Sequence, residues 1–231
     1  MEYKLIALDI DGTLLNSSNQ ITDNVKEAIK KSKEKGVKVV LCTGRPLKGV
    51  EDFLEELNLK EEGDYVTTFN GALVQDAYTG KPISHLTLDY NDLCDLYNLS
   101  LKIGSRSHFY DTKTVYTFNL DVSDYTILES YLTGAHLNVT TLDKVPKDIG
   151  MSKFMMIDHP EILDECIKKI PEEYYEKYTI VRSTPFFLEI LNKNANKGAG
   201  INLLSQRLGI KQDEVICVGD AGNDKHMIEY A

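Results

Sequence analysis

Short runs of consecutive apolar residues recur along the chain, at residues 5–8, 37–41, 65–69 and 215–218. In these runs the apolar positions follow one another instead of alternating with polar ones. That pattern is typical of strands that helices cover on both faces of a parallel sheet. We therefore expect the four runs to be strands of one buried sheet.

Helical spacing of apolar residues fills the intervals between these runs. One helical pattern covers residues 21–35 and is ended by Gly36, and shorter patterns cover residues 52–59 and 200–208. Strands that alternate with helices in this way favour right-handed crossover connections. The pattern predicts a doubly wound, Rossmann-like α/β core with a parallel sheet.

The stretch from residue 83 to residue 188 follows a different pattern. Its strand-like segments are aromatic and β-branched, and helical patterns lie between them; the strand-like segments are 114–118, 154–157 and 178–182, and the helical ones are 89–103 and 161–170. Such a mixture predicts an α+β domain with an antiparallel sheet. We therefore expect a core made of residues 1–82 and 189–231, with an inserted domain of residues 83–188.

Composition and charge limit the possible partners. The chain has 231 residues, of which 42% are hydrophobic and 27% charged, as in ordinary globular proteins. Its net charge of -10 comes without the concentrated basic surface that nucleic-acid binding needs. The amino-terminal apolar run is too short for a signal peptide or a membrane span. Neither nucleic acid nor a membrane is therefore the expected partner.

The cysteines indicate a reducing compartment. Cys42, Cys94, Cys166 and Cys217 are scattered and form no Cys-x-x-Cys pair. We expect free thiols in a cytoplasmic protein. Cys42 and Cys217 lie inside apolar runs, where cysteine acts as a small hydrophobic residue.

Carboxylates follow directly after the first and the last of the predicted strands. Asp9 and Asp11 belong to the sequence Asp-Ile-Asp-Gly-Thr, and Asp220 and Asp224 to Gly-Asp-Ala-Gly-Asn-Asp. Open α/β sheets bind ligands at this edge, and Mg²⁺ prefers carboxylate oxygens. The pattern predicts a magnesium site if the two strands are neighbours, although Asp and Gly are also ordinary turn formers. A calcium-binding EF-hand is excluded, because its Asp-x-Asp-x-Asp-Gly order and distal Glu are missing.

Groups that suit phosphate lie at two further boundaries. Thr43, Gly44 and Arg45 follow the second predicted strand and offer a hydroxyl, an accessible backbone N–H and a guanidinium. Lys197 precedes the last predicted helix, where its ammonium and the helix dipole both attract anions. Each motif alone also fits a helix cap or a solvated side chain.

Taken in order, these motifs resemble those of the haloacid-dehalogenase-like hydrolases. The matching blocks are Asp9-Ile-Asp11-Gly12-Thr13, Thr43-Gly44-Arg45, Lys197-Gly198 and Gly219-Asp220-x-x-Asn223-Asp224. The insertion lies on the carboxyl-terminal side of Asn70-Gly71-Ala72, which is similar to the position of the cap in the Cof-type branch of sugar-phosphate phosphatases. The resemblance implies that the inserted domain is a cap that closes over the active site. It also implies a core sheet truncated at one edge, because family members continue beyond the position of Ala231.

The resemblance assigns chemistry to the acidic residues. Asp9 would attack phosphorus and form an aspartyl-phosphate, and Asp11 would protonate the leaving alkoxide and then deprotonate water. Mg²⁺ would be held by Asp9, by the backbone carbonyl of Asp11 and by Asp220, with Asp224 supporting the metal shell or Lys197. The implied enzyme is a Mg²⁺-dependent phosphatase that hydrolyses small organic phosphate monoesters, with sugar phosphates as the favoured class.

The other motif residues are expected to bind the substrate. The phosphate-binding set is Thr43, Gly44, Lys197 and Asn223, and the set for the rest of the substrate is Arg45 and Asn70. In the cap, Arg106, His108 and Arg182 could meet a polar substrate, but an ordinary sheet-face or surface role is the stronger expectation for each.

The alternatives are a phosphomutase of the same superfamily, which passes the phosphoryl group to a sugar hydroxyl, and a non-catalytic metal- or ligand-binding module. An intact pair of Asp9 and Asp11 argues against the module, because binding alone needs no acid–base partner. The expected oligomeric state is a monomer or a weak homodimer.

Overall fold

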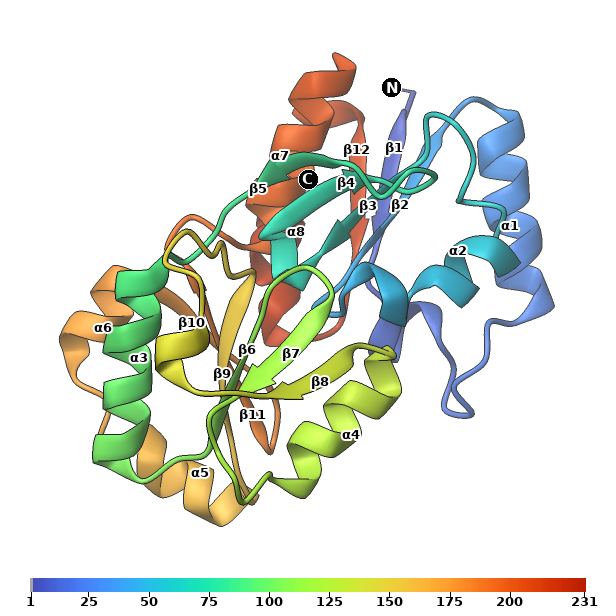
Figure 1. Ribbon diagram of the computed structural model, residues 1–231. Helices are drawn as coiled ribbons and strands as arrows, with labels where there is room; N and C mark the ends of the chain where they lie inside the picture. Colours follow the sequence, from blue (N-terminus) through green and yellow to red (C-terminus); the bar gives the residue numbers. More distant parts are fainter. Residues whose placement is uncertain (1) are drawn as a thin grey trace. The chain divides into compact units, whose positions relative to one another are not determined.

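The computed structural model describes residues 2–231 and divides them into two compact units (Figure 1). The core unit comprises the chain up to His85 together with Ala195–Ala231, and the inserted unit comprises Leu86–Asn194. The predicted boundaries, after residues 82 and 188, were therefore a few residues too early. Strand β5 (Pro82–His85) pairs with a core strand, and strand β11 (Phe187–Asn192) pairs with strands of the inserted unit.

The core unit contains one six-stranded sheet in the order β12-β1-β2-β3-β4-β5. Its elements are β1 (Leu5–Leu8), α1 (Asp23–Glu34), β2 (Lys38–Cys42), α2 (Glu51–Glu56), β3 (Tyr65–Thr68), β4 (Leu73–Asp76), β5, α7 (Lys197–Leu208), β12 (Val215–Val218) and α8 (Lys225–Tyr230). Strands β12, β1, β2 and β3 are parallel, which confirms the predicted α/β core. Strands β4 and β5 add an antiparallel hairpin at one edge.

Helices cover both faces of the core sheet, with α1 and α2 on one side and α7 and α8 on the other (Figure 1). Successive side chains of a strand point to opposite faces. On β2, Val39 and Leu41 join the cluster under α1 and α2, while Val40 and Cys42 join the cluster under α7 and α8.

Burial raises the pKa of the thiol of Cys42 and that of Cys217, the latter to about 12, so both are neutral packing residues.

The inserted unit contains a second six-stranded sheet, in the order β10-β11-β9-β6-β7-β8. Its elements are α3 (Tyr90–Ile103), β6 (Ser107–Tyr110), β7 (Thr114–Thr117), α4 (Asp124–Thr133), β8 (His136–Val139), β9 (Lys153–Ile157), α5 (Pro160–Ile167), α6 (Glu172–Lys177), β10 (Tyr178–Thr184) and β11. The expected antiparallel arrangement holds for every pair except β7 and β8, which are parallel. Helix α4 connects these two strands, and a crossover of this kind is what parallel pairing requires.

The two faces of the inserted sheet differ in polarity. Leu96 of α3 and Leu163 of α5 pack with Phe109, Phe154 and Ile190 in an apolar cluster on one face. On the other face, the residues that α4 buries against the sheet are polar or charged and not apolar: Thr126, Glu129 and Thr133.

A buried charged cluster lies beneath α4. The Nζ atom of Lys153 is 3.4 Å from Glu129 Oε1 and 3.3 Å from Glu189 Oε2, and the Tyr110 hydroxyl donates a 3.2 Å hydrogen bond to Glu129. Burial opposes the charge on Lys153, but the two carboxylates outweigh it and raise the pKa of this lysine. Charged and polar contacts therefore attach α4 to the sheet.

Among residues 2–231, no helix combines the length and the apolar character that crossing a lipid bilayer requires.

Candidate active site

The carboxyl ends of the parallel core strands gather the predicted site residues at one edge of the sheet. The Asp9 amide donates a 3.0 Å hydrogen bond to the Val218 carbonyl, which extends the pairing of β1 with β12. The Thr43 amide donates to the Thr67 carbonyl, and the Asn70 amide donates to the Thr43 carbonyl, both at 2.9 Å. The loops after β12, β1, β2 and β3 are thereby held side by side.

Three carboxylates meet at this edge. One oxygen of each of Asp9, Asp220 and Asp224 lies within 4.8 Å of the others, although more than two hundred residues separate Asp9 from the other two. The Thr13 hydroxyl donates a 2.8 Å hydrogen bond to Asp220 Oδ1 and fixes the rotation of that carboxylate. Such an all-oxygen set fits a hard divalent cation such as Mg²⁺. The Asp11 side chain is not part of this group, which is compatible with a ligand role for its backbone carbonyl only.

Two glycines at the site lie too close to the acidic side chains to leave room for a Cβ atom in this arrangement. Gly12 has φ +86°, and a Cβ atom there would lie 2.5 Å from Asp220 Oδ2. Gly219 leaves equally little room, because its Cβ atom would lie 2.4 Å from the Asp224 carboxyl carbon. The absence of a side chain at Gly12 lets the loop after β1 approach Asp220, and its absence at Gly219 lets the loop after β12 fold back onto Asp224.

Replacing Gly12 by alanine should lower the free energy of unfolding by about 2–4 kcal/mol, because a left-handed backbone and a steric clash add together. Gly36→Ala is the matched control, since Gly36 has φ +81° and open space around it. Gly36→Ala should lower the free energy of unfolding by only about 1–2 kcal/mol. Thermal and chemical denaturation measure both values, and equal losses would show that the contact with Asp220 is not tight.

A buried lysine joins the carboxylates. Lys197 begins α7, is fully buried, and places Nζ 2.5 Å from Asp9 Oδ1 and 2.6 Å from Asp224 Oδ1. Burial raises the pKa of Asp9, and the positive charge of Lys197 opposes that rise. Burial also lowers the pKa of Lys197, but its anionic neighbours outweigh this effect, so the pKa of the lysine is raised. The other oxygen of Asp224 accepts the amides of Asp220 and Ala221. Asp224 therefore links the lysine to the loop that carries Asp220.

Asp9 and Lys197 are both buried, so Lys197 is not the solvated side chain that its motif alone would also fit. Asp9 is only 6% exposed, and Lys197 is held below the surface at the first turn of its helix. The Asn196 side chain caps that helix by accepting the Ala199 amide at 2.8 Å. The sequence pattern around Asn196 predicts a helix start but not the depth at which it lies.

Two asparagines bridge the loops after β3 and β12. Asn223 Nδ2 donates a 3.1 Å hydrogen bond to Asn70 Oδ1. Asn70 is buried and has φ +51°, and a Cβ atom at Gly44 would lie 3.0 Å from its amide nitrogen, a tight contact. The structure thus brings the predicted phosphate-binding residues Gly44 and Asn223 together, with the predicted substrate contact Asn70 between them.

Arg45 binds the second aspartate of the first motif. Its Nε donates to Asp11 Oδ2 at 3.0 Å and its Nη2 donates to Asp11 Oδ1 at 2.6 Å. The Arg45 amide donates to the Thr43 hydroxyl at 3.1 Å. We call the two parallel bonds the Asp11–Arg45 fork. No sequence signal connected these two residues, and the role of Thr13 was likewise missed although it belongs to the same motif.

The polar candidates of the inserted unit have structural partners. His108 is buried against Thr126 and Met155, and burial lowers its pKa well below the usual value. Arg106 forms ion pairs with Asp121 and Asp158, and Arg182 forms one with Asp164, all within the inserted unit.

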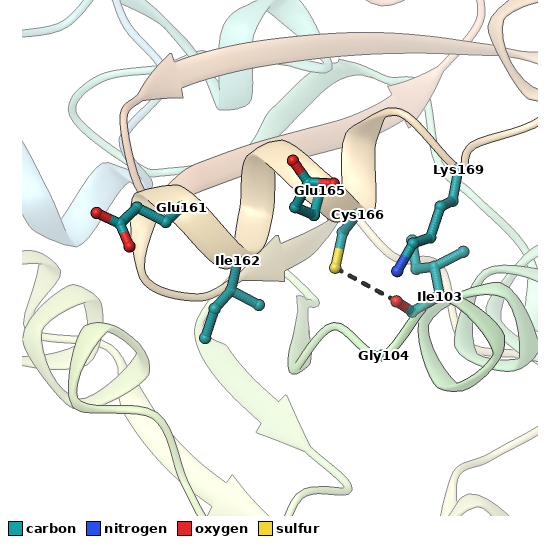
Figure 2. Close-up of a pocket in the computed structure, with 7 residues that line it drawn as sticks. All are labelled: Ile103, Gly104, Glu161, Ile162, Glu165, Cys166 and Lys169. Carbon is teal, nitrogen blue, oxygen red and sulfur yellow. Dashed lines mark hydrogen bonds between the residues drawn. The ribbon is translucent and has the colours of Figure 1, made fainter.

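A pocket of about 420 Å³ in the inserted unit contains none of the predicted site residues. It lies between the end of α3 and helix α5, where Cys166 donates its S–H to the Ile103 carbonyl at 3.4 Å (Figure 2). Glu161, Glu165 and Lys169 also line it. The motif carboxylates and Lys197 instead meet in the core unit, so the chemistry is assigned there.

Comparison with known proteins agrees with this assignment. The sequence profile of the haloacid dehalogenase-like hydrolases matches residues 6–231. YxeH of Bacillus subtilis is 53% identical over 229 residues, covering 99% of this chain and 85% of YxeH. The 5-amino-6-(5-phospho-D-ribitylamino)uracil phosphatase YitU, also of Bacillus subtilis, is 27% identical over 248 residues, covering 100% of this chain and 86% of YitU.

A solved structure of a haloacid dehalogenase-like hydrolase from Bacteroides thetaiotaomicron has the same fold. It aligns with a TM-score of 0.85 and 27% identity, covering 100% of this chain and 86% of that chain. A profile match across the chain, a relative above half identity and a shared fold all agree with the strand-end motifs. The chain therefore belongs to the haloacid dehalogenase-like hydrolases of the Cof type, and it is a phosphoric monoester hydrolase.

Proposed function

We propose that the protein is a Mg²⁺-dependent phosphatase of small organic phosphate monoesters, and that Asp9 is its nucleophile. The observation that carries the proposal is the contact of Asp9 with Lys197 beside Asp220 and Asp224. An anionic nucleophile can attack an anionic phosphate only where nearby positive charge offsets the repulsion. Lys197 supplies one such charge, and the carboxylates are suited to hold another.

The first step transfers the phosphoryl group to Asp9. A carboxylate oxygen of Asp9 forms a bond to phosphorus while the bond from phosphorus to the ester oxygen breaks. Asp11 gives its proton to the departing alkoxide, which leaves as an alcohol. Lys197 holds Asp9 in place from its Oδ1 side, so the other oxygen can face the substrate.

The second step hydrolyses the aspartyl-phosphate. Asp11, now a carboxylate, takes a proton from water as the water oxygen bonds to phosphorus. The bond between phosphorus and Asp9 breaks, and inorganic phosphate leaves. Gly44, Thr43 and Asn223 lie at the same edge of the sheet and would bind the phosphate oxygens in both steps.

Asp9, Asp220 and the backbone carbonyl of Asp11 would hold the metal ion, with Asp224 supporting them through Lys197 and the loop amides. When bound, Mg²⁺ supplies positive charge next to the transferring phosphoryl group. The close packing of Gly12 against Asp220 keeps the two ligand loops together.

The proposed substrates are phosphorylated metabolites of the sugar-phosphate kind, in the cytoplasm. The name of YitU, which describes a phosphorylated ribityl compound, supports a phosphate on a polyhydroxylated carbon chain. A net charge of -10 and free cysteines support a cytoplasmic protein that does not bind nucleic acid. We propose that it acts as a monomer or a weak homodimer.

Metal removal tests the proposal. Release of inorganic phosphate from a panel of phosphorylated metabolites should stop after chelation and return with Mg²⁺. Asp220→Asn should raise the Mg²⁺ concentration for half-maximal activity by roughly tenfold or more, whereas Asp213→Asn, at an exposed position, should not change it. Activity that survives thorough chelation would remove the metal from the mechanism, and phosphate release that depends on a sugar bisphosphate would favour a phosphomutase.

A further inference from the structure

The Asp11–Arg45 fork uses the edge of the guanidinium that Nε and Nη2 form. Nε and Nη2 bind the two oxygens of Asp11, and Nη1 donates a 3.4 Å hydrogen bond to the Gly49 carbonyl. A two-point contact fixes both the distance and the plane of a carboxylate, which a single ammonium cannot do.

Arg45 is itself restrained on the core unit. Its amide is bonded to the Thr43 hydroxyl, and its guanidinium carbon lies 5.7 Å from the centre of the Phe53 ring. The side chain of Arg45 is 30% exposed, whereas that of Asp11 is 57% exposed. The more exposed partner, Asp11, is thus oriented by the more restrained one.

We infer that Arg45 is a positioning residue for the acid–base group Asp11, and not a direct substrate contact as the sequence predicted. The inference rests on the proposed function, in which Asp11 moves protons to and from the reacting oxygens. An Arg45 that gripped the substrate with the same edge would have to release Asp11 first. Arg45 instead sets where the Asp11 carboxylate stands when it takes the proton from water.

The test is a double-mutant cycle with p-nitrophenyl phosphate and Mg²⁺. Arg45→Met should lower kcat on the order of 10²-fold, because misplacing a catalytic group by about 1 Å has an effect of that size. KM should change by less than about twofold, since no ground-state contact with substrate is lost. The kcat of Arg45→Lys should lie between that of the wild type and that of Arg45→Met, because an ammonium keeps the charge but cannot form the fork.

The cycle separates the two roles of Arg45. In the Asp11→Asn background, Arg45→Met should lower kcat by less than about a further threefold, because the effects of groups that act as a unit are not additive. Equal losses in both backgrounds, or a raised KM with kcat unchanged, would show that Arg45 binds the substrate and would overturn the inference. If Asp11→Asn leaves too little turnover for the cycle, the split between kcat and KM in the single variants decides.

Controls keep this test apart from the proposed function. Lys48→Met removes a positive charge three residues from Arg45, where Lys48 only pairs with Glu51 at the surface, and it should retain wild-type kinetics. Unchanged melting temperatures would exclude a folding defect in the variants. A wild-type protein without phosphatase activity, or a fully active Asp9→Asn variant, would refute the proposed function itself.

Discussion

Asp9→Asn should lower phosphatase turnover by at least about 10⁴-fold, the scale of losing a covalent nucleophile. The amide has nearly the same shape as the carboxylate, but its oxygen is a poor nucleophile towards phosphorus. Lys197 would still be paired with Asp224 at 2.6 Å, so the ammonium would keep an anionic partner. Steady-state phosphate release, followed over hours to reach the low rates, measures the loss.

The fold of Asp9→Asn should survive. The new side chain can still accept a hydrogen bond from Lys197, so the melting temperature should remain close to the wild-type value. Asp23→Asn is the matched control, because Asp23 lies fully exposed at the start of α1 and should affect neither rate nor stability. Wild-type turnover in Asp9→Asn would assign the nucleophile to another group.

Lys153→Met should lower the free energy of unfolding by about 3–5 kcal/mol, the usual cost of breaking a buried ion pair from one side. Glu129 and Glu189 would lose their cation while remaining 8% and 3% exposed. Because Glu129 belongs to α4, the loss should loosen that helix first. Urea denaturation measures the free energy, and hydrogen exchange of the α4 amides locates the change.

Lys168→Met is the matched control for Lys153→Met. Its ammonium pairs with Glu165 on the surface and is 68% exposed, so the change should stay within about 0.5 kcal/mol. Equal effects of the two substitutions would mean that the cluster under α4 contributes no more to stability than a surface pair.

The apolar runs predicted the centre of the core sheet well. Strands β1 and β12 begin and end where their runs do, because four consecutive apolar residues are a strong signal when helices cover both faces of a sheet. The hairpin of β4 and β5 was missed, although its turn has a recognisable cause: Asp76 accepts the amide of Thr79, and Gly80 has φ +70°. Short strands at a sheet edge carry little apolar pattern of their own.

The motifs predicted which residues gather at the site but not how they pair. Lys197 and Asp9 are 188 residues apart, and nothing in the local sequence of either encodes a buried contact between them. The same holds for Asp11 and Arg45, whose partnership depends on two loops that only the folded sheet brings together. Burial and pairing are properties of the assembled core, whereas residue identity and strand-end position are properties of the sequence.

Assembly of the site from both ends of the chain has a consequence for its synthesis. A ribosome that has reached Asn194 has made Asp9 and the whole inserted unit, but none of Lys197, Asp220 or Asp224. Domains form in the order in which they emerge, so the nascent polypeptide carries Asp9 without its lysine until the segment that begins at Ala195 has emerged. Strand β12 must then pair with β1, and this pairing brings Asp220 and Asp224 to Asp9 in a single event.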